Sequence, residues 1–151
     1  MKASRLFLAA LVAAIPSYLL SSEIKGLNVL MTSADAQTQM MGMVLSNSVL
    51  NDQKKAVTIT LCGPAANLAL KEFTSPNVKK PDGSEANPKT ALQGLMKAGA
   101  SVSVCPLFLP NAGKEASSLI EGISVAKPPM VAAGLINTEL HTASFSHPTW
   151  S

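Results

Sequence analysis

The two cysteines are the side chains of this sequence best suited to covalent chemistry. Cys62 and Cys105 each follow a short apolar or β-branched run, and each has a proline within the next two residues. A cysteine reacts as its thiolate, so a reactive site must lower the thiol pKa and leave the sulfur accessible. For both residues the alternative is a buried, idle thiol, because free cysteine packs like a small hydrophobe.

Other residue types give weaker chemical signals. Met40 and Met43 lie three apart with helical spacing, and thioethers suit Cu(I), but such a stripe is more typical of a core or a subunit interface. His141 and His147 lack ligand-like spacing to a cysteine, so we expect surface histidines and no metal site. Asp35 could line a cleft, although a helix cap is the favoured role. No cofactor motif, glycine-rich phosphate loop or Ser–His–Asp array is recognisable.

Short apolar runs alternate with helical patterns along residues 23–146. The expected strands cover residues 27–32, 56–61, 101–104, 123–125 and 142–145. The expected helices cover residues 37–50, 65–70, 90–99 and 129–136. Residues 74–89 contain three prolines and a glycine, so we expect an exposed loop there.

Two of these helices allow more detailed predictions. Within residues 37–50, helical spacing gives one apolar face of Met40, Met43 and Val44 beside another of Met41, Leu45 and Val49. Residues 90–93 (TALQ) match a capping box, which predicts that the next helix begins at Thr90. Its expected buried face consists of Leu92, Leu95 and Met96.

The alternation of strands and helices predicts an α/β fold, a three-layer α/β/α sandwich with a mostly parallel sheet of about five strands. Sites in such sheets form at the carboxyl ends of the strands. Cys62 ends the second expected strand and Cys105 ends the third. Both thiols are therefore candidate site residues at one edge of the sheet.

Composition excludes some classes of protein. The 151 residues are 47% hydrophobic, which is enough for a packed core in one domain. Only 14% are charged and 4% aromatic, which argues against a nucleic-acid binder. Lys2 and Arg5 are the only charges before Glu23; without them the net charge of +3 becomes +1, and no arginine remains.

The first 22 residues have the order of a secretory signal. A basic start is followed by a fifteen-residue apolar run, interrupted by Pro16, and by the pair Ser21–Ser22. A buried core helix and an uncleaved membrane anchor are the alternatives. Cleavage is expected near Ser21 or Ser22, although residues 34–36 (ADA) also fit the pattern. We therefore expect a periplasmic or secreted domain over residues 23–146, a tail at 147–151, and no stable membrane insertion after cleavage.

Residues 102–113 (VSVCPLFLPNAG) and 119–126 (LIEGISVA) resemble the DsrE/DsrF-like (TusD/YchN-like) sulfur-relay family. The opening strand with its helix and the closing run that ends in Phe145 resemble that family too. The resemblance implies a DsrE-like fold, with Cys105 at the position of the sulfur-carrying cysteine. The family's Arg-Gly is Ala112-Gly113 here, which removes a cation near the thiol, and Phe108 replaces a second cysteine found in some members.

The resemblance implies a sulfurtransferase-like carrier in which a thiolate takes up sulfane sulfur as a persulfide. Asn111, Gly113 and Lys114 are expected to supply donors or charge near Cys105, together with a helix N-terminus. The resemblance also implies that the second and third strands are neighbours. That would put Cys62 within disulfide reach of Cys105, whereas an intervening strand would not. Cys62 is thus a candidate resolving thiol, a disulfide partner or an idle thiol.

The resemblance also implies partners. Related proteins form trimers or hexamers, so we expect a homo-oligomer and a thiol or persulfide partner protein. The apolar run Leu107–Leu109 must be covered, by a subunit interface or by the same chain. A different class of function is a non-catalytic oligomeric binding module that uses the same cleft for a small ligand or partner protein.

Overall fold

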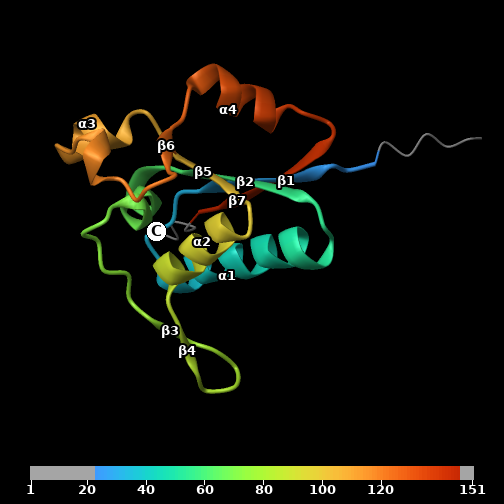
Figure 1. The fold of residues 1–151 in the computed structure, drawn as a ribbon, viewed down its shortest axis with the longest axis horizontal. Helices are drawn as coiled ribbons and strands as arrows, with labels where there is room; N and C mark the ends of the chain where they lie inside the picture. Colours follow the sequence, from blue (N-terminus) through green and yellow to red (C-terminus); the bar gives the residue numbers. More distant parts are fainter. Residues whose placement is uncertain (1–22, 147–151) are drawn as a thin grey trace, which may run out of the picture.

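A computed structural model describes residues 23–146, which form a parallel five-stranded sheet between two unequal layers of helices (Figure 1). The strands are β1 (Gly26–Met31), β2 (Ala56–Leu61), β5 (Ser101–Val104), β6 (Ser124–Val125) and β7 (Leu140–Phe145). Their order in the sheet is β6-β5-β2-β1-β7, and every pairing is parallel. The α/β/α architecture expected from the sequence is confirmed, with each strand within about two residues of its predicted position.

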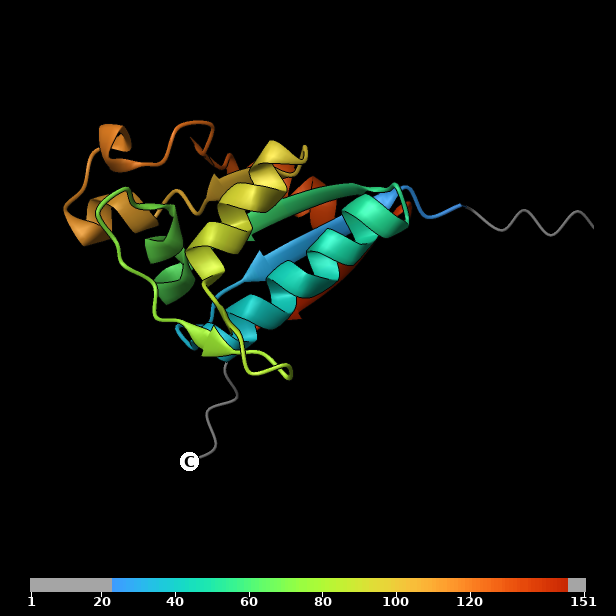
Figure 2. The ribbon, with the colours of Figure 1, turned by 60° about the horizontal axis from the view of Figure 1, so that its bottom comes forward.

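The helices α1 (Ala36–Asn47) and α2 (Pro88–Lys97) cover one face of the sheet, together with the 3-10 helix η2 (Gly63–Ala69). Among residues 23–146, the helix on the opposite face is α4 (Pro128–Leu135) (Figure 1). This helix lies in the connection from β6 at one edge to β7 at the other, so it crosses above the sheet (Figures 1 and 2). Its short length leaves much of that face uncovered.

The two faces of the sheet differ in chemistry, as the register shows. One face aligns Val29, Ile59 and Val102, and these side chains belong to the buried core beneath α1 and α2. The other face aligns Asn28 with Thr58 and Ser101, and Leu30 with Thr60, Ser103 and Ser124. The strands are therefore apolar toward the thick helical layer and rich in hydroxyl groups toward α4.

The apolar faces predicted for the first helix are correct only in part: Met43 is buried and Met40 and Val49 pack against the core, but the other three residues do not. The side of α1 that packs on the sheet consists of Gln39, Gly42, Met43 and Ser46, whereas Met41, Val44 and Leu45 are exposed. A Cβ on Gly42 would lie only 2.3 Å from Cε of Met31 and 3.4 Å from Phe145. Close approach of the helix to the sheet therefore selects small residues at this contact, and the apolar ones are left outside. A π-helical turn, Ser48–Asp52, extends the helix.

The prediction of an exposed loop over residues 74–89 is wrong in two places. A short hairpin pairs β3 (Val78–Lys79) with β4 (Glu85–Ala86) (Figure 2). The helix α2 begins at Pro88, not Thr90, because the side chain of Asn87 accepts hydrogen bonds from the backbone N–H groups of Lys89 and Thr90. The proline-rich sequence therefore contains the helix start, with proline in its first turn. Leu92 and Leu95 are buried as expected.

The expected signal segment, residues 1–22, and the tail with His147 lie outside the described residues. Between residues 23 and 146, the structure has no helix of the length and apolarity needed to cross a membrane.

Candidate functional site

Cys62 and Cys105 lie side by side at the carboxyl ends of adjacent strands. The pairing of β2 with β5 runs to Leu61 opposite Val104, and the cysteines are the next residues of each strand. The backbone N–H of Cys105 donates to the carbonyl oxygen of Leu61 at 2.8 Å, and that of Cys62 to the carbonyl of Met31 at 2.8 Å. The ladder therefore holds both backbones beyond the last paired residue. The expectation that these strands are neighbours is confirmed.

The two thiols hydrogen-bond with each other, and both are free, not joined in a disulfide. Burial of the sulfur, then the hydrogen bond and the charge of Cys105, raise the pKa of the Cys62 thiol from 9.0 to about 11. Desolvation and a neighbouring negative charge both oppose formation of a thiolate. Cys62 is therefore a protonated hydrogen-bond donor at neutral pH.

Cys105 opens onto a hollow on the surface, of about 540 Å³. Its other walls come from the start of η2 (Gly63, Pro64 and Asn67) and from the segment after Cys105 (Leu107, Phe108, Asn111 and Ala112). Apolar atoms make up most of this lining. Both cysteines are half-buried, and Cys105 lines the hollow whereas Cys62 does not.

The segment after Cys105 forms a short helix that the sequence did not predict, α3 (Phe108–Ala112). Leu109 points into the core, but Leu107 is 68% exposed, so the chain itself covers only part of this apolar run. Gly113 ends the helix in the left-handed conformation, with φ 61°.

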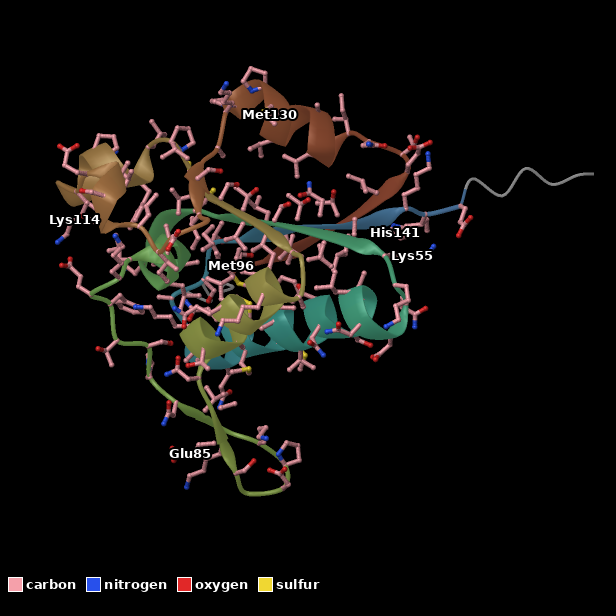
Figure 3. All side chains as sticks on the ribbon, in the orientation of Figure 1. Lys55, Glu85, Met96, Lys114, Met130 and His141 are labelled. Atoms are coloured by element: carbon pink, nitrogen blue, oxygen red, sulfur yellow. The ribbon has the colours of Figure 1, made fainter. Side chains whose placement is uncertain are left out.

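The donors expected around Cys105 have other partners. The side chain of Asn111 donates to the carbonyl oxygen of Leu107 at 2.7 Å. Lys114 forms an ion pair with Glu72 at the α3 end of the molecule (Figure 3). Both residues thus have partners other than Cys105, whereas the thiol of Cys62 hydrogen-bonds with it.

The remaining candidate residues lie away from the thiols. Asp35 is the helix cap, because its carboxylate accepts from the backbone N–H of Thr38 at 2.7 Å. Met43 is buried in the core with Met40 packed against it, so this part of the methionine stripe is core. His141 is exposed on β7, at the end of the molecule away from Lys114 (Figure 3). Within residues 23–146, no cluster of three or more His, Cys, Asp or Glu side chains could hold a metal ion.

The structure contains a second cavity that sequence reasoning missed. It lies between α4 and the hydroxyl-rich face of the sheet, and neither cysteine lines it. A signal was present in the sequence, because Thr58 and Thr60, and likewise Ser101 and Ser103, are spaced by two within predicted strands. This spacing directs their hydroxyl groups to one face of the sheet.

No protein-family model and no curated protein sequence matches the chain. Solved structures do match it. The protein of unknown function MTH1491 from Methanobacterium thermoautotrophicum superposes with a TM-score of 0.61 at 10% identity, covering 79% of this chain and 97% of its own. The YchN protein from E. coli superposes with a TM-score of 0.60 at 16% identity, covering 78% of this chain and 99% of its own. At these identities the likeness shows a shared fold, a YchN-like α/β fold.

Proposed function

We propose that the protein is a DsrE-like sulfur carrier in which Cys105 takes up sulfane sulfur as a persulfide. The observation that supports this function is the pair of hydrogen-bonded thiols at the end of β2 and β5, with Cys105 facing a surface hollow. A carrier needs one accessible thiol and a neighbouring hydrogen-bond donor that stabilises its thiolate. The YchN-like fold and the family resemblance of residues 102–126 point the same way.

Loading is a transfer without net oxidation. The Cys105 thiolate attacks the outer sulfur of a donor persulfide, R–S–SH, so a Cys105–S–SH bond forms and R–S⁻ leaves. The S–H of Cys62 stabilises the attacking thiolate. An acceptor thiolate on a partner protein then attacks the outer sulfur in the same way and regenerates Cys105. The apolar hollow beside Cys105 gives donor and acceptor a surface to dock on.

Cys62 gives the Cys105 persulfide a second way to lose its outer sulfur, besides transfer to a partner protein. Its sulfur can attack the inner sulfur of the Cys105 persulfide, which releases H₂S and leaves a Cys62–Cys105 disulfide. The two thiols are oxidised and the sulfane sulfur is reduced, so electrons balance. Adjacent parallel strands lie about 4.8 Å apart, which suits the Cα separation of a disulfide. Because Cys62 is protonated at neutral pH, this step is slow compared with transfer to a reactive partner thiol.

The test is intact-mass spectrometry after incubation of the reduced protein with a small-molecule persulfide donor. Wild type and Cys62→Ser should gain one sulfur atom, about 32 Da, whereas Cys105→Ser should gain none. Cys62→Ser should also hold its persulfide longer, because it cannot form the disulfide. Equal sulfur uptake by Cys105→Ser, or no uptake by Cys62→Ser, would exclude the carrier function.

A non-catalytic binding module is the second candidate, favoured by the apolar lining of the same hollow. Under that function a partner protein binds at Leu107 and Phe108 with no need for a thiol. Binding to the partner would then survive Cys105→Ser and fail in Leu107→Asp, and no persulfide would form.

We also propose that the domain is exported and assembles with copies of itself. Residues 1–22 have the pattern of a cleavable signal, which would place residues 23–146 in the periplasm or outside the cell. A trimer or hexamer would bury the apolar side chains that the single chain leaves exposed. The amino-terminal sequence of the protein purified from the envelope tests the first proposal, and its mass in solution tests the second.

A further inference from the structure

The cavity beneath α4 is built from polar side chains below and apolar side chains above. It has a volume of about 450 Å³. Asn28, Thr60, Ser103 and Ser124 contribute to its floor from four neighbouring strands, and Met130 and Val131 contribute to its roof from α4. This size falls within the range of pockets that hold small organic molecules. The helix α4 crosses above the sheet (Figure 1), and the cavity lies between this helix and the hydroxyl-rich sheet face.

Two polar side chains on the floor, Asn28 and Thr60, face the cavity and make no side-chain hydrogen bond with the rest of residues 23–146. Asn28 is 5% exposed and Thr60 is 4% exposed. The equally buried side chain of Gln39, by contrast, donates to the carbonyl oxygen of Ser33 at 2.8 Å. Polar atoms that face a cavity and make no bond within the protein are available to donate to, or accept from, a bound molecule.

The charges around the cavity restrict what can fill it. Among the described residues, no Asp or Glu lines it, and the single ionisable lining residue, Lys127, is an exposed residue just before α4. A charged group against the floor would be desolvated without a counter-ion, which is strongly unfavourable. Neutral amide and hydroxyl groups are matched instead by neutral donors and acceptors.

We propose that this cavity is a binding site for a small uncharged organic molecule that carries an amide or hydroxyl group on an apolar skeleton. The polar group of the ligand bonds to Asn28 and Thr60, and its apolar part packs beneath Met130 and Val131. No cysteine lines the cavity, so the site is separate from the thiol pair and does not depend on the sulfur chemistry.

The side-chain NH₂ group of Asn28 is a direct reporter of binding. Its NMR signals, assigned by their loss in Asn28→Leu, are followed while matched sets of fragments are added. Each set carries a primary amide, a carboxylate or an ammonium group on the same phenylalkyl or alkyl skeleton. Amides should shift the Asn28 signals with saturation, and the charged fragments should bind at least about tenfold more weakly.

Three variants locate the bound fragment. Thr60→Val keeps the side-chain shape but removes the hydroxyl, and should weaken amide binding by roughly fivefold. Gly134→Leu should abolish it, because a Cβ at Gly134 already lies 3.3 Å from Nδ2 of Asn28 and a longer side chain would enter the cavity. Thr142→Val is the matched control: it lies opposite Asn28 on β7 but does not line the cavity, and should bind as wild type does.

Three results would overturn the proposal. The first is that no amide fragment moves the Asn28 signals at millimolar concentration. The second is an affinity unchanged by both Thr60→Val and Gly134→Leu. The third is a shift of the Asn28 signals with protein concentration alone, which would mean that a second copy of the chain fills the space.

Discussion

At the scale of single residues, the two cysteines show how one position in a sheet can produce two different thiols. Both end a parallel strand, and the backbone N–H of each donates to the neighbouring strand. Cys105 faces the hollow, whereas burial and the contact with Cys105 keep Cys62 protonated. The geometry thus places one thiol at the hollow and a protonated thiol beside it.

The raised pKa of Cys62 predicts a pH dependence of folding. An unfolded chain loses this proton near pH 9.0, but the folded protein keeps it to about pH 11. Between these values the folded state binds more protons, so the free energy of unfolding falls as pH rises through the window and is unaffected by this group below it. Urea unfolding of reduced wild type and Cys62→Ala should therefore converge from pH 9 to 11. Curves that stay parallel would contradict the shift.

A buried hydroxyl in α1 offers a second test. Ser46 is fully buried, and its Oγ has no hydrogen-bond partner among residues 23–146. Ser46→Ala should raise the free energy of unfolding by about 1 kcal/mol, since it removes an unpaired polar group and favours the helix. Gln39→Leu is the contrasting change, because it leaves the carbonyl of Ser33 unpaired and should cost roughly 1–3 kcal/mol. Thermal unfolding of both variants measures the difference; a destabilised Ser46→Ala would refute the reasoning.

The sequence could predict that Cys62 and Cys105 meet, because each ends a strand of recognisable pattern. It could not predict which polar groups surround them. Lys114 follows Cys105 closely in the chain, yet its partner is Glu72, which is distant in sequence. Likewise, the cavity that Asn28 faces depends on how α4 crosses the sheet, and no local sequence pattern predicts that crossing.

At the scale of elements, substitution by alanine should have opposite effects on stability at two glycines, one in a strand and one in a helix. A Cβ on Gly26 in β1 would lie 2.6 Å from the carbonyl oxygen of Ala56 and 3.2 Å from Leu140, so strands β2 or β7 would have to move. Gly94 in α2 has nothing within 4 Å of the same atom. Gly26→Ala should lose roughly 1–3 kcal/mol of stability by overpacking, and Gly94→Ala should gain about 0.8–1.0 kcal/mol from helix propensity.

Chemical unfolding of Gly26→Ala, Gly94→Ala and wild type measures both changes in the free energy of unfolding. The chemistry of the change is identical, so only the surroundings of the glycine differ. A tolerated Gly26→Ala would mean that β1 is less closely held between β2 and β7 than the register indicates.

Element prediction succeeded where the pattern itself decides the structure. The strand Ser101–Val104 has the predicted bounds, because a short β-branched run followed by cysteine and proline leaves little alternative. It failed for the buried side of α1, where packing distance outweighs hydrophobicity at Gly42. It also failed for the hairpin β3–β4, whose strands of two residues each are too short to show a period.

At the scale of the whole molecule, the single chain leaves apolar side chains exposed on both of its helical layers. On α1, Met41 and Val44 are each 54% exposed; at α4, Met130 is 70% and Ile136 is 81% exposed. The two helices lie on opposite sides of the sheet (Figure 1). Because the patches on α1 and at α4 differ and lie on opposite sides, the α1 patch of one copy can contact the α4 patch of the next. Such a head-to-tail contact produces a closed ring when the rotation from copy to copy brings the last copy back to the first.

The last prediction follows from that arrangement. Multi-angle light scattering should show the wild-type protein as a trimer or hexamer. Either Val44→Glu on α1 or Ile136→Glu after α4 should lower the measured mass to that of a monomer, because each variant places a charge in the same apolar contact. Thr74→Glu makes the same change of charge at an exposed loop residue outside both patches and should keep the wild-type mass. Disruption by only one of the two Glu variants would indicate an isologous contact in which one patch meets its own copy. A wild-type monomer at all concentrations would exclude the assembly and leave both apolar patches exposed to solvent.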